Sequence, residues 1–491
     1  MSRCKIAVGA LASAILAWSV PALAQSPNYG APLPDPHIPG YHFPEPENTV
    51  LGWVNNQPAQ SPEIYLHGWG LWASLTAPSG MPAYGEANAP VYLTWLTKAD
   101  LQKASTPKGP LLLATAAEKR GLALEETTQL LKFGIHSIGP KIQLKARPGA
   151  ITPDTGTLET VAYDPEAASH ILDAKLFQLA TIQALYTAKQ PETPAFDPKA
   201  VAVKPVYKVV RKAELYQGRY YVIPAWPGTP PEVTPAIEKN GYPETSWPGC
   251  LYVDTTDSGG TSASGTDPNC SGPTPATTYG LGDFVALPIT KENVQQFQVA
   301  NGVKKLVPGD MLLLVAMHVS SREITAWTWQ TYFWTPNPKA PPLPSSTAIA
   351  STAPSQLTGA AAHYAETFAY DMVDPNQPVS GGTSTGLPVI GFNPYLEAGF
   401  PKSVFGLLRP ITDPKTGKSW IGTVGIQTNC MTCHSLAAVT FAATSNPTAY
   451  GTDFYIGRTD SYFTNMVQTD FLWSIADVDS SQQQSSEKKT K

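Results

Sequence analysis

The sequence predicts a mixed α+β fold in which a β-rich N-terminal part precedes a C-terminal region of helices and loops. The chain has 491 residues, with 49 prolines, 38 glycines and only 14% charged residues. This composition favours short strands joined by many loops over a bundle of helices. Runs of alternating apolar and polar residues between 200 and 334 support the same fold class. The 12 tryptophans and 21 tyrosines predict large aromatic clusters in the core or around a pocket.

The first residues are typical of a secretory signal peptide. A basic head precedes an apolar run from Ile6 to Val20, and a cleavage site of small residues ends at Ala24. We therefore predict a signal peptide at 1–24 and a mature chain that is periplasmic or secreted. The apolar run is shorter than the roughly 20 residues of a membrane helix, and no later segment approaches that length, so we expect no membrane span.

The N-terminal elements follow from local patterns. Residues 25–58 are rich in proline, asparagine and glycine, so we expect them to lie extended over the surface. A helix should begin at Ser61 and Pro62, and residues 89–97 are typical of a strand.

Two helices and a series of strands are expected next. We predict short helices within 115–133 and 164–189, and in the second Asp164 and Pro165 supply a cap and a first-turn proline. Residues 200–253 alternate as strands do. The clearest hairpin joins 311–319 to 323–334, and its alternation places Met317 and His318 on opposite faces.

Beyond the hairpin the composition changes. Residues 335–356 have the proline, serine and alanine content of a linker, a helix is predicted at 357–371, and a short helix should continue through 434–444. The last ordered piece is expected at 470–478. We divide the mature chain into a β-rich domain at 25–345, a C-terminal region at 346–478 and a disordered tail at 479–491.

The cysteines divide into a signal-peptide residue and two pairs. Cys250 and Cys270 flank a loop of glycine, serine, threonine and aspartate, which predicts a disulfide in an exported protein. Such a bond should stabilise the fold by roughly 3 kcal/mol. Asp254, Asp257 and Asp267 in this loop could hold calcium, although their spacing fits no EF-hand, and a solvated turn is the alternative.

The second pair lies in a motif with specific chemistry. Cys430 and Cys433 are separated by two residues, and His434 follows directly. This spacing suits thioether attachment of a c-type haem, with the histidine as the proximal iron ligand. A thioredoxin-like redox pair and half of a zinc site are the alternatives. No second Cys or His pair has the spacing of zinc ligands, so we predict one covalent haem c in the region 346–478.

The sixth iron ligand is open. Met466 lies downstream of the motif, whereas His363, Met372 and His318 lie upstream, and each of them is otherwise an ordinary core residue. An empty or water-bound sixth position is a further alternative.

Charge gives further, weaker indications. Arg409 and Arg458 could pair with haem propionates, or with surface carboxylates. The formal net charge of -5 and the absence of any lysine or arginine run argue against a nucleic-acid partner.

Four segments together resemble a known family. The segments "LHGWGLWASLTAP", "AMHVSSREITAWTWQTYFW", "GFNPYLEAGF" and "TNCMTCHSLA" resemble large, exported, single-haem bacterial proteins described as cytochrome c family proteins. The resemblance runs over most of the mature chain and implies haem attachment at Cys430, Cys433 and His434. It implies export as well, and no particular reaction.

Three functions are compatible with this sequence. The first is electron transfer with a periplasmic redox partner protein, which needs a six-coordinate iron. The second is a peroxidase- or oxygenase-like haem enzyme, in which an open iron site acts on a small-molecule substrate and His318 or His363 serves as acid or base. The third is a haem-based ligand sensor. The motif favours electron transfer, because the sequence contains no further recognisable catalytic pattern.

Overall fold

The structure of the chain is a computed structural model. It describes residues 28–56, 61–106, 120–126, 156–299, 304–374, 387–405, 410–412, 419–421, 424–441 and 457–476. The predicted signal peptide and the predicted tail lie outside these residues.

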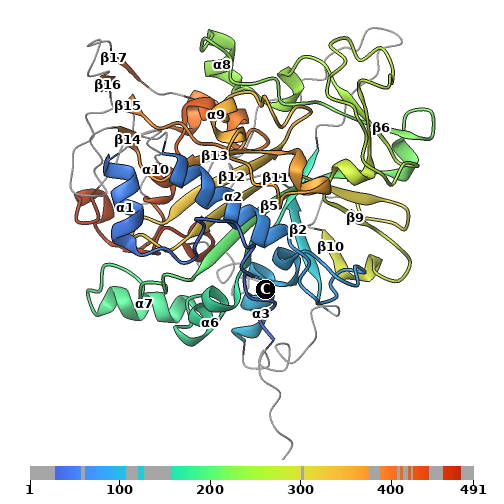
Figure 1. Ribbon diagram of the computed structural model, residues 1–491. Coiled ribbons are helices and arrows are strands. Elements are labelled where there is room, and N and C mark those ends of the chain that lie inside the picture. Colours follow the sequence, from blue (N-terminus) through green and yellow to red (C-terminus); the bar gives the residue numbers. More distant parts are fainter. Residues whose placement is uncertain are drawn as a thin grey trace, which may run out of the picture.

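A ten-stranded sheet forms the centre of a mixed α/β fold (Figure 1). Its longest strands, β5 (Val201–Val210) and β11 (Met311–Ser321), pair antiparallel, and β12 (Thr328–Trp334) continues the sheet beside β11. Along the main path the strand order is β10-β2-β3-β5-β11-β12-β13. The remaining members are β1 (Leu96–Thr97), β2 (Leu122–Glu126), β3 (Thr157–Glu159), β4 (Ala162–Tyr163), β9 (Ala286–Pro288), β10 (Phe297–Val299) and β13 (Tyr364–Ala369).

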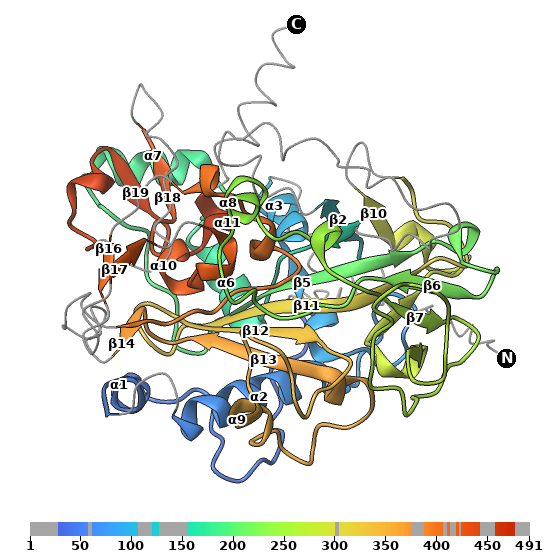
Figure 2. The ribbon, with the colours of Figure 1, turned by 90° about the horizontal axis from the view of Figure 1, so that it is seen from above.

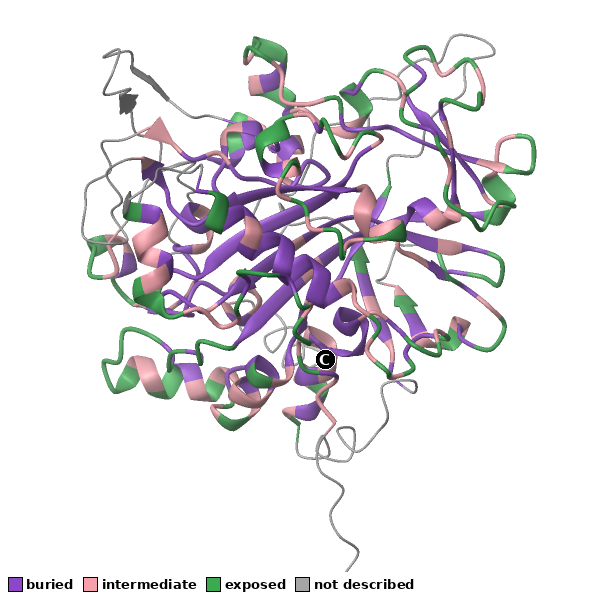
Figure 3. Ribbon diagram, in the orientation of Figure 1, coloured by how far each residue is buried: buried purple, intermediate pink, exposed green. Residues whose placement is uncertain are grey.

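The two faces of this sheet are covered by different parts of the chain (Figure 2). On one face lie the helices α1 (Glu47–Asn56), α2 (Pro62–Thr76) and α9 (Thr347–Ala350). On the other lie the C-terminal elements α10 (Cys430–His434), β18 (Ala438–Thr440), β19 (Met466–Gln468) and α11 (Trp473–Ala476), beside α6 (Pro165–Asp173) and α7 (Leu179–Thr187). The sheet is therefore buried on both faces, as the burial colours show (Figure 3).

Aromatic side chains fill the core as the composition predicts. On the α2 side, Trp72 stacks on Tyr332 of β12 with ring centroids 4.5 Å apart. Side chains alternate along a strand, so Trp329, three residues earlier on β12, faces the C-terminal elements instead. The same alternation separates Met317, which is buried in the main core, from His318, which lines a cavity.

Several sequence predictions agree with the structure. The hairpin of β11 and β12 forms as expected, and α2 begins at Pro62. Asp164 caps α6 by accepting hydrogen bonds from the N–H groups of Ala167 and Glu166. The disulfide between Cys250 and Cys270 is present, with Cα atoms 5.6 Å apart.

Other element predictions were wrong, because tertiary contacts override local preference. The helix predicted at 357–371 is instead a 3-10 turn (Gly359–His363) followed by β13. The edge of β12 that does not pair with β11 offers backbone hydrogen-bond partners to an extended segment, and β13 pairs with it. Within the predicted helix 434–444, α10 ends at His434 and residues Ala438–Thr440 pair with β19.

The N-terminal half contains further corrections. Residues 25–58, expected to be extended, contain α1. Of the strand expected at 89–97, Val91–Thr94 form a 3-10 helix and Leu96–Thr97 form the short strand β1. The predicted segment 164–189 forms two helices, because Lys175 adopts a φ of 54° that ends the first. Of the helix predicted within 115–133, the described part contains the strand β2.

The loop closed by the disulfide contributes the strand β7 (Leu251–Asp254) to a separate small sheet. Strands β6 (Tyr220–Ile223), β7 and β8 (Thr278–Gly280) form it, with α8 (Pro235–Asn240) between β6 and β7 in the chain. Asp254 accepts hydrogen bonds from Arg219, and Asp267 accepts from Tyr252 and from the Ser271 N–H group. The carboxylates of Asp254 and Asp267 therefore accept hydrogen bonds from groups of the protein itself.

Three two-stranded ribbons complete the described strands. One of them pairs β18 with β19, and the others pair β14 (Val373–Asp374) with β15 (Leu387–Pro388) and β16 (Pro410–Thr412) with β17 (Ser419–Ile421). Across the ranges given above, no helix combines the length and apolarity needed to cross a membrane.

Candidate functional site: a cavity at the C-x-x-C-H motif

The motif residues form a short helix that is fixed at its start. The side chain of Asn429 accepts a hydrogen bond from the N–H group of Thr432 at 3.0 Å and so caps α10. Its amide nitrogen donates to the carbonyl oxygens of Asp371 and Val389, both at 2.8 Å. A buried asparagine therefore anchors the motif to two neighbouring segments.

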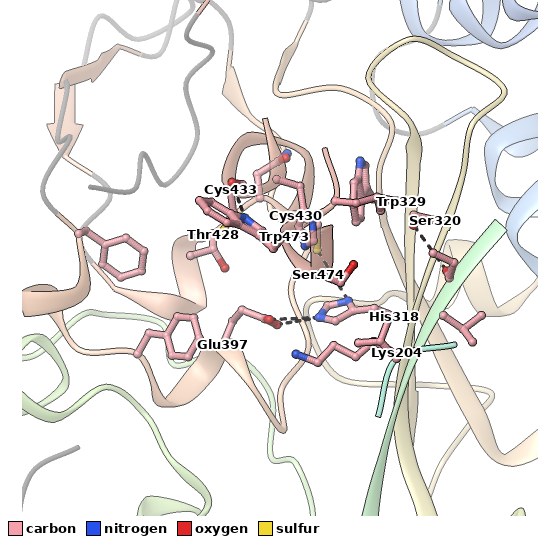
Figure 4. A pocket seen from close by; sticks show the side chains of 18 residues that line it. Lys204, His318, Ser320, Trp329, Glu397, Thr428, Cys430, Cys433, Trp473 and Ser474 are labelled. Carbon is pink, nitrogen blue, oxygen red and sulfur yellow. Dashed lines mark hydrogen bonds and ion pairs between the residues drawn. The ribbon is translucent and has the colours of Figure 1, made fainter. Parts of the chain in front are cut away.

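The motif lines a large cavity between the sheet and the C-terminal elements (Figure 4). The space not filled by protein atoms is about 1070 Å³, including the opening to solvent. Its walls come from both sides of the predicted boundary at residue 345. The lining residues are Val161, Ala202, Val203, Lys204, His318, Ser320, Trp329, Glu397, Phe400, Phe405, Thr428, Asn429, Cys430, Cys433, His434, Leu472, Trp473 and Ser474.

His434 is held as a neutral imidazole. Its Nδ1 atom lies 2.8 Å from the carbonyl oxygen of Phe471, and because a carbonyl can only accept, Nδ1 carries the proton and Nε2 keeps the lone pair. Burial lowers the pKa of His434 to about 3, although the Phe471 carbonyl acts in the opposite direction. The ring is therefore in the form that binds a metal through Nε2.

The two cysteines are free thiols that face the same cavity. Cys430 and Cys433 form no disulfide with each other, and the Cys430 sulfur lies 3.1 Å from the carbonyl oxygen of Gly391. Burial, with smaller effects of Glu397 and Cys433, raises the pKa of the Cys430 thiol well above its ordinary value. Cysteines of dithiol redox motifs have lowered pKa values, so this environment does not favour the thioredoxin-like alternative.

The zinc alternative also lacks support in the described part of the chain. None of its groups of histidine, cysteine, aspartate and glutamate has the geometry of a metal-ion site.

His318 reaches the cavity from β11. Its Nδ1 atom lies 2.7 Å from Thr331 Oγ1 and 4.0 Å from the Cys430 sulfur, and its Nε2 lies 3.1 Å from a carboxylate oxygen of Glu397. Burial alone would raise the pKa of Glu397, yet His318, the Asn393 N–H group and Lys204 together lower it below its usual value. The imidazole and the carboxylate thus form a hydrogen-bonded pair at the cavity wall (Figure 4).

Lys204 adds a cation to the same part of the wall. It projects from β5 beside His318 and forms an ion pair with Glu159, with nitrogen and oxygen 2.9 Å apart. Lys204, Glu397 and Trp329 were not predicted as site residues from the sequence. Their only sequence signals are their residue types, because they lie far from the motif in the chain.

The remaining candidate residues lie elsewhere. Met466 packs in an apolar cluster that also includes Cys433, but it does not line the cavity. His363 forms an ion pair with Asp283, with Nε2 and Oδ1 3.1 Å apart, and burial lowers its pKa. Met372 is fully buried in the main core.

Of the two arginines considered for haem propionates, Arg458 is described, and it does not line the cavity. Arg458 pairs with Glu192 and its guanidinium lies over the ring of Phe471, 5.4 Å from the centroid. Arg409 lies outside the described residues.

No protein-family model, curated protein or solved structure matches this chain. The assignment of the site therefore depends on its own residues. Two cysteines and a neutral histidine face one cavity, and apolar rings of Trp329, Phe400 and Phe405 form much of the wall. The wall therefore combines these apolar rings with the polar groups of Lys204, Ser320 and Ser474, a lining that suits a flat, apolar ligand with a polar edge.

Proposed function

We propose that this chain is an exported c-type cytochrome that binds one haem c and transfers electrons. Haem c would be attached through Cys430 and Cys433, with His434 as the proximal iron ligand. The observation that carries this proposal is that all three motif residues line one cavity. When bound, haem c supplies a one-electron iron couple.

The protein residues would set the properties of that couple. The Nδ1–H group of His434 donates to the Phe471 carbonyl, which fixes the tautomer and increases the electron donation of the ring. The apolar rings of Trp329 and Phe400 in the cavity wall would limit the contact of a bound haem with water, and burial of a haem tunes its redox potential. A large surrounding chain can therefore control the potential of a single haem.

The two-part organisation belongs to the same proposal. Residues 346–478 would form the haem c-binding region, and the β-rich part at 25–345 would supply the opposite wall through β5, β11 and β12. The partner would be a periplasmic redox protein, in keeping with the predicted signal peptide and the resemblance to cytochrome c family proteins.

His318 is the one sixth-ligand candidate named from the sequence that lines the cavity, whereas Met466, His363 and Met372 do not. Electron transfer requires a filled sixth coordination position, so we propose His318 for it. Ligation through Nε2 would require Glu397 to release this nitrogen, which it holds at 3.1 Å.

That same hydrogen bond favours a second candidate function. If His318 stays paired with Glu397, the sixth position is open and the pair can move a proton beside it. The protein would then be a haem enzyme or a ligand sensor that takes a small molecule into the cavity.

The first experiment tests haem attachment. The full chain is produced in the periplasm with a haem c maturation system, denatured and examined for covalent haem by its pyridine haemochrome spectrum. The matched control is the double variant Cys430→Ser/Cys433→Ser, which should carry none. Wild-type protein without covalent haem would overturn the proposal.

Carbon monoxide then distinguishes the candidates. A reduced wild-type protein that remains low-spin and does not bind carbon monoxide supports electron transfer. Rapid binding at a high-spin iron supports the open-site candidate instead.

A further inference from the structure

A segment near the C-terminus holds the motif through hydrogen bonds. The N–H group of Thr469 donates to the carbonyl oxygen of Ala437 at 3.0 Å, and the indole N–H of Trp473 donates to the carbonyl oxygen of Cys433 at 3.2 Å. Between these contacts the Phe471 carbonyl accepts from His434 at 2.8 Å. The position of His434 therefore depends on the backbone of residues 469–473.

The middle of this segment has an unusual backbone. Asp470 and Phe471 have φ values of 44° and 68°, in the left-handed region that favours glycine. Aspartate tolerates this region, but a bulky phenylalanine rarely occupies it. Two adjacent residues in this conformation persist only when their surroundings hold them, and such residues are concentrated at functional sites.

The surroundings of Asp470 provide that restraint. One carboxylate oxygen, Oδ2, accepts from Arg322 Nε at 3.0 Å and from the Phe196 N–H group at 3.1 Å. Arg322 lies in the turn between β11 and β12, and its own N–H group donates to the Ala200 carbonyl oxygen at 3.0 Å. Asp470 is 3% exposed, so the ion pair is shielded from solvent.

We propose that Arg322 and Asp470 are positioning residues for His434. Their ion pair holds the left-handed turn at 470–471, and this turn presents the Phe471 carbonyl to Nδ1 of the imidazole. The proposal extends the proposed function, because it takes His434 as the iron ligand. It assigns to Arg322 and Asp470 the orientation of that ligand and a share of the control of its electron donation.

The physical consequence concerns the Nδ1–H bond. A firmly held carbonyl keeps the proton on Nδ1 and gives the ring partial imidazolate character, which stabilises oxidised iron. If the ion pair is broken, the turn can relax, the hydrogen bond weakens, and the reduction potential should rise.

The test compares Asp470→Asn and Arg322→Lys with a matched control. Arg211 and Asp310 form a buried pair at the other end of the sheet, with Nη1 and Oδ2 also 3.0 Å apart. Asp310→Asn should therefore lower the free energy of unfolding by a similar amount. Because this pair lies at the other end of the sheet, the substitution should not affect His434.

Two readouts are made on the full mature chain with its haem. The first is the midpoint potential. We expect Asp470→Asn to raise it by an amount that corresponds to about a threefold change in the reduction equilibrium constant, or roughly 28 mV, since tenfold is 59 mV for one electron. The second is hydrogen–deuterium exchange of the His434 Nδ1 proton by NMR, which should become at least about tenfold faster, as expected for 1.4 kcal/mol of lost hydrogen bonding. Arg322→Lys keeps the charge, so it should show smaller changes in the same direction.

A purely structural role predicts a different result. If Asp470→Asn and Asp310→Asn lose similar stability while neither the potential nor the exchange rate moves, the positioning role is overturned. If Asp470→Asn does not fold, Arg322→Lys decides by the same two readouts.

The failure of haem attachment can be told apart from the failure of this inference. In a chain without haem, the ¹⁵N shifts of His434 still report which ring nitrogen carries the proton. A loss of the Nδ1–H tautomer in Asp470→Asn but not in Asp310→Asn supports positioning, and an unchanged tautomer in both overturns it.

Discussion

The indole ring of Trp329 packs against the imidazole of His434, with ring centroids 4.0 Å apart and ring planes inclined by 35°. The indole is itself fixed, because its Nε1 donates to the carbonyl oxygen of Ala326 at 3.0 Å. A residue of the sheet thus contacts the proposed iron ligand directly, although 105 positions separate the two in the chain.

Replacement of Trp329 should affect both stability and the haem. Trp329→Ala should lower the free energy of unfolding by about 3–5 kcal/mol, the range for a buried large ring. It should also broaden the orientation of His434, which is visible in the electron paramagnetic resonance spectrum of the oxidised protein. Trp247→Ala, in a separate core cluster, is the control that should lower stability and leave the spectrum unchanged. An unchanged spectrum in Trp329→Ala would contradict this prediction.

Removal of His318 tests the sixth ligand. Under the electron-transfer proposal, His318→Ala opens the coordination position, so the reduced variant should bind carbon monoxide while the wild type does not. Met466→Leu and His363→Ala should behave as the wild type does, because neither residue lines the cavity. Carbon monoxide binding gained in Met466→Leu instead would show that the wrong ligand was assigned.

The ion pair of Arg219 and Asp254 predicts a specific dependence of stability on pH. The hydrogen bond from Arg219 lowers the pKa of Asp254 to about 2, below its ordinary value. The pair therefore stabilises the fold fully above the ordinary aspartate pKa, and this contribution is lost as the pH falls through about 2. Arg219→Gln should be less stable than the wild type at pH 7, and the difference should disappear in acid. Urea titrations at several pH values measure it, and a difference that persists at the lowest pH would contradict the assignment.

The disulfide should contribute stability without contributing to the haem site. The double variant Cys250→Ser/Cys270→Ser frees a loop whose ends are separated by 20 positions, and it should lose roughly 3 kcal/mol of unfolding free energy. Covalent haem should still form, because neither residue lines the cavity. A variant that folds but lacks haem would show an unexpected coupling between the loop and the motif.

The parts of the fold that were predicted correctly depend on neighbours in the chain. The hairpin of β11 and β12 follows from alternation within a few residues, and the cap of α6 follows from Asp164 and Pro165. The helix wrongly predicted at 357–371 shows where this reasoning fails. Its residues form β13 because β12 lies beside them in space, and no local pattern reports that neighbour.

The candidate site shows the same division. The sequence by itself determined which residues are proposed to attach the haem, because Cys430, Cys433 and His434 are placed by the spacing of one short motif. Only the tertiary structure decided which of the distant candidates meets that motif: His318, 112 positions from Cys430, reaches the cavity, whereas Met466 does not. The tertiary structure also brings Trp329 and Phe471 into contact with His434. The physical reason is that such contacts arise when the two faces of a sheet bury apolar surface, and burial depends on the whole chain rather than on a short stretch of it.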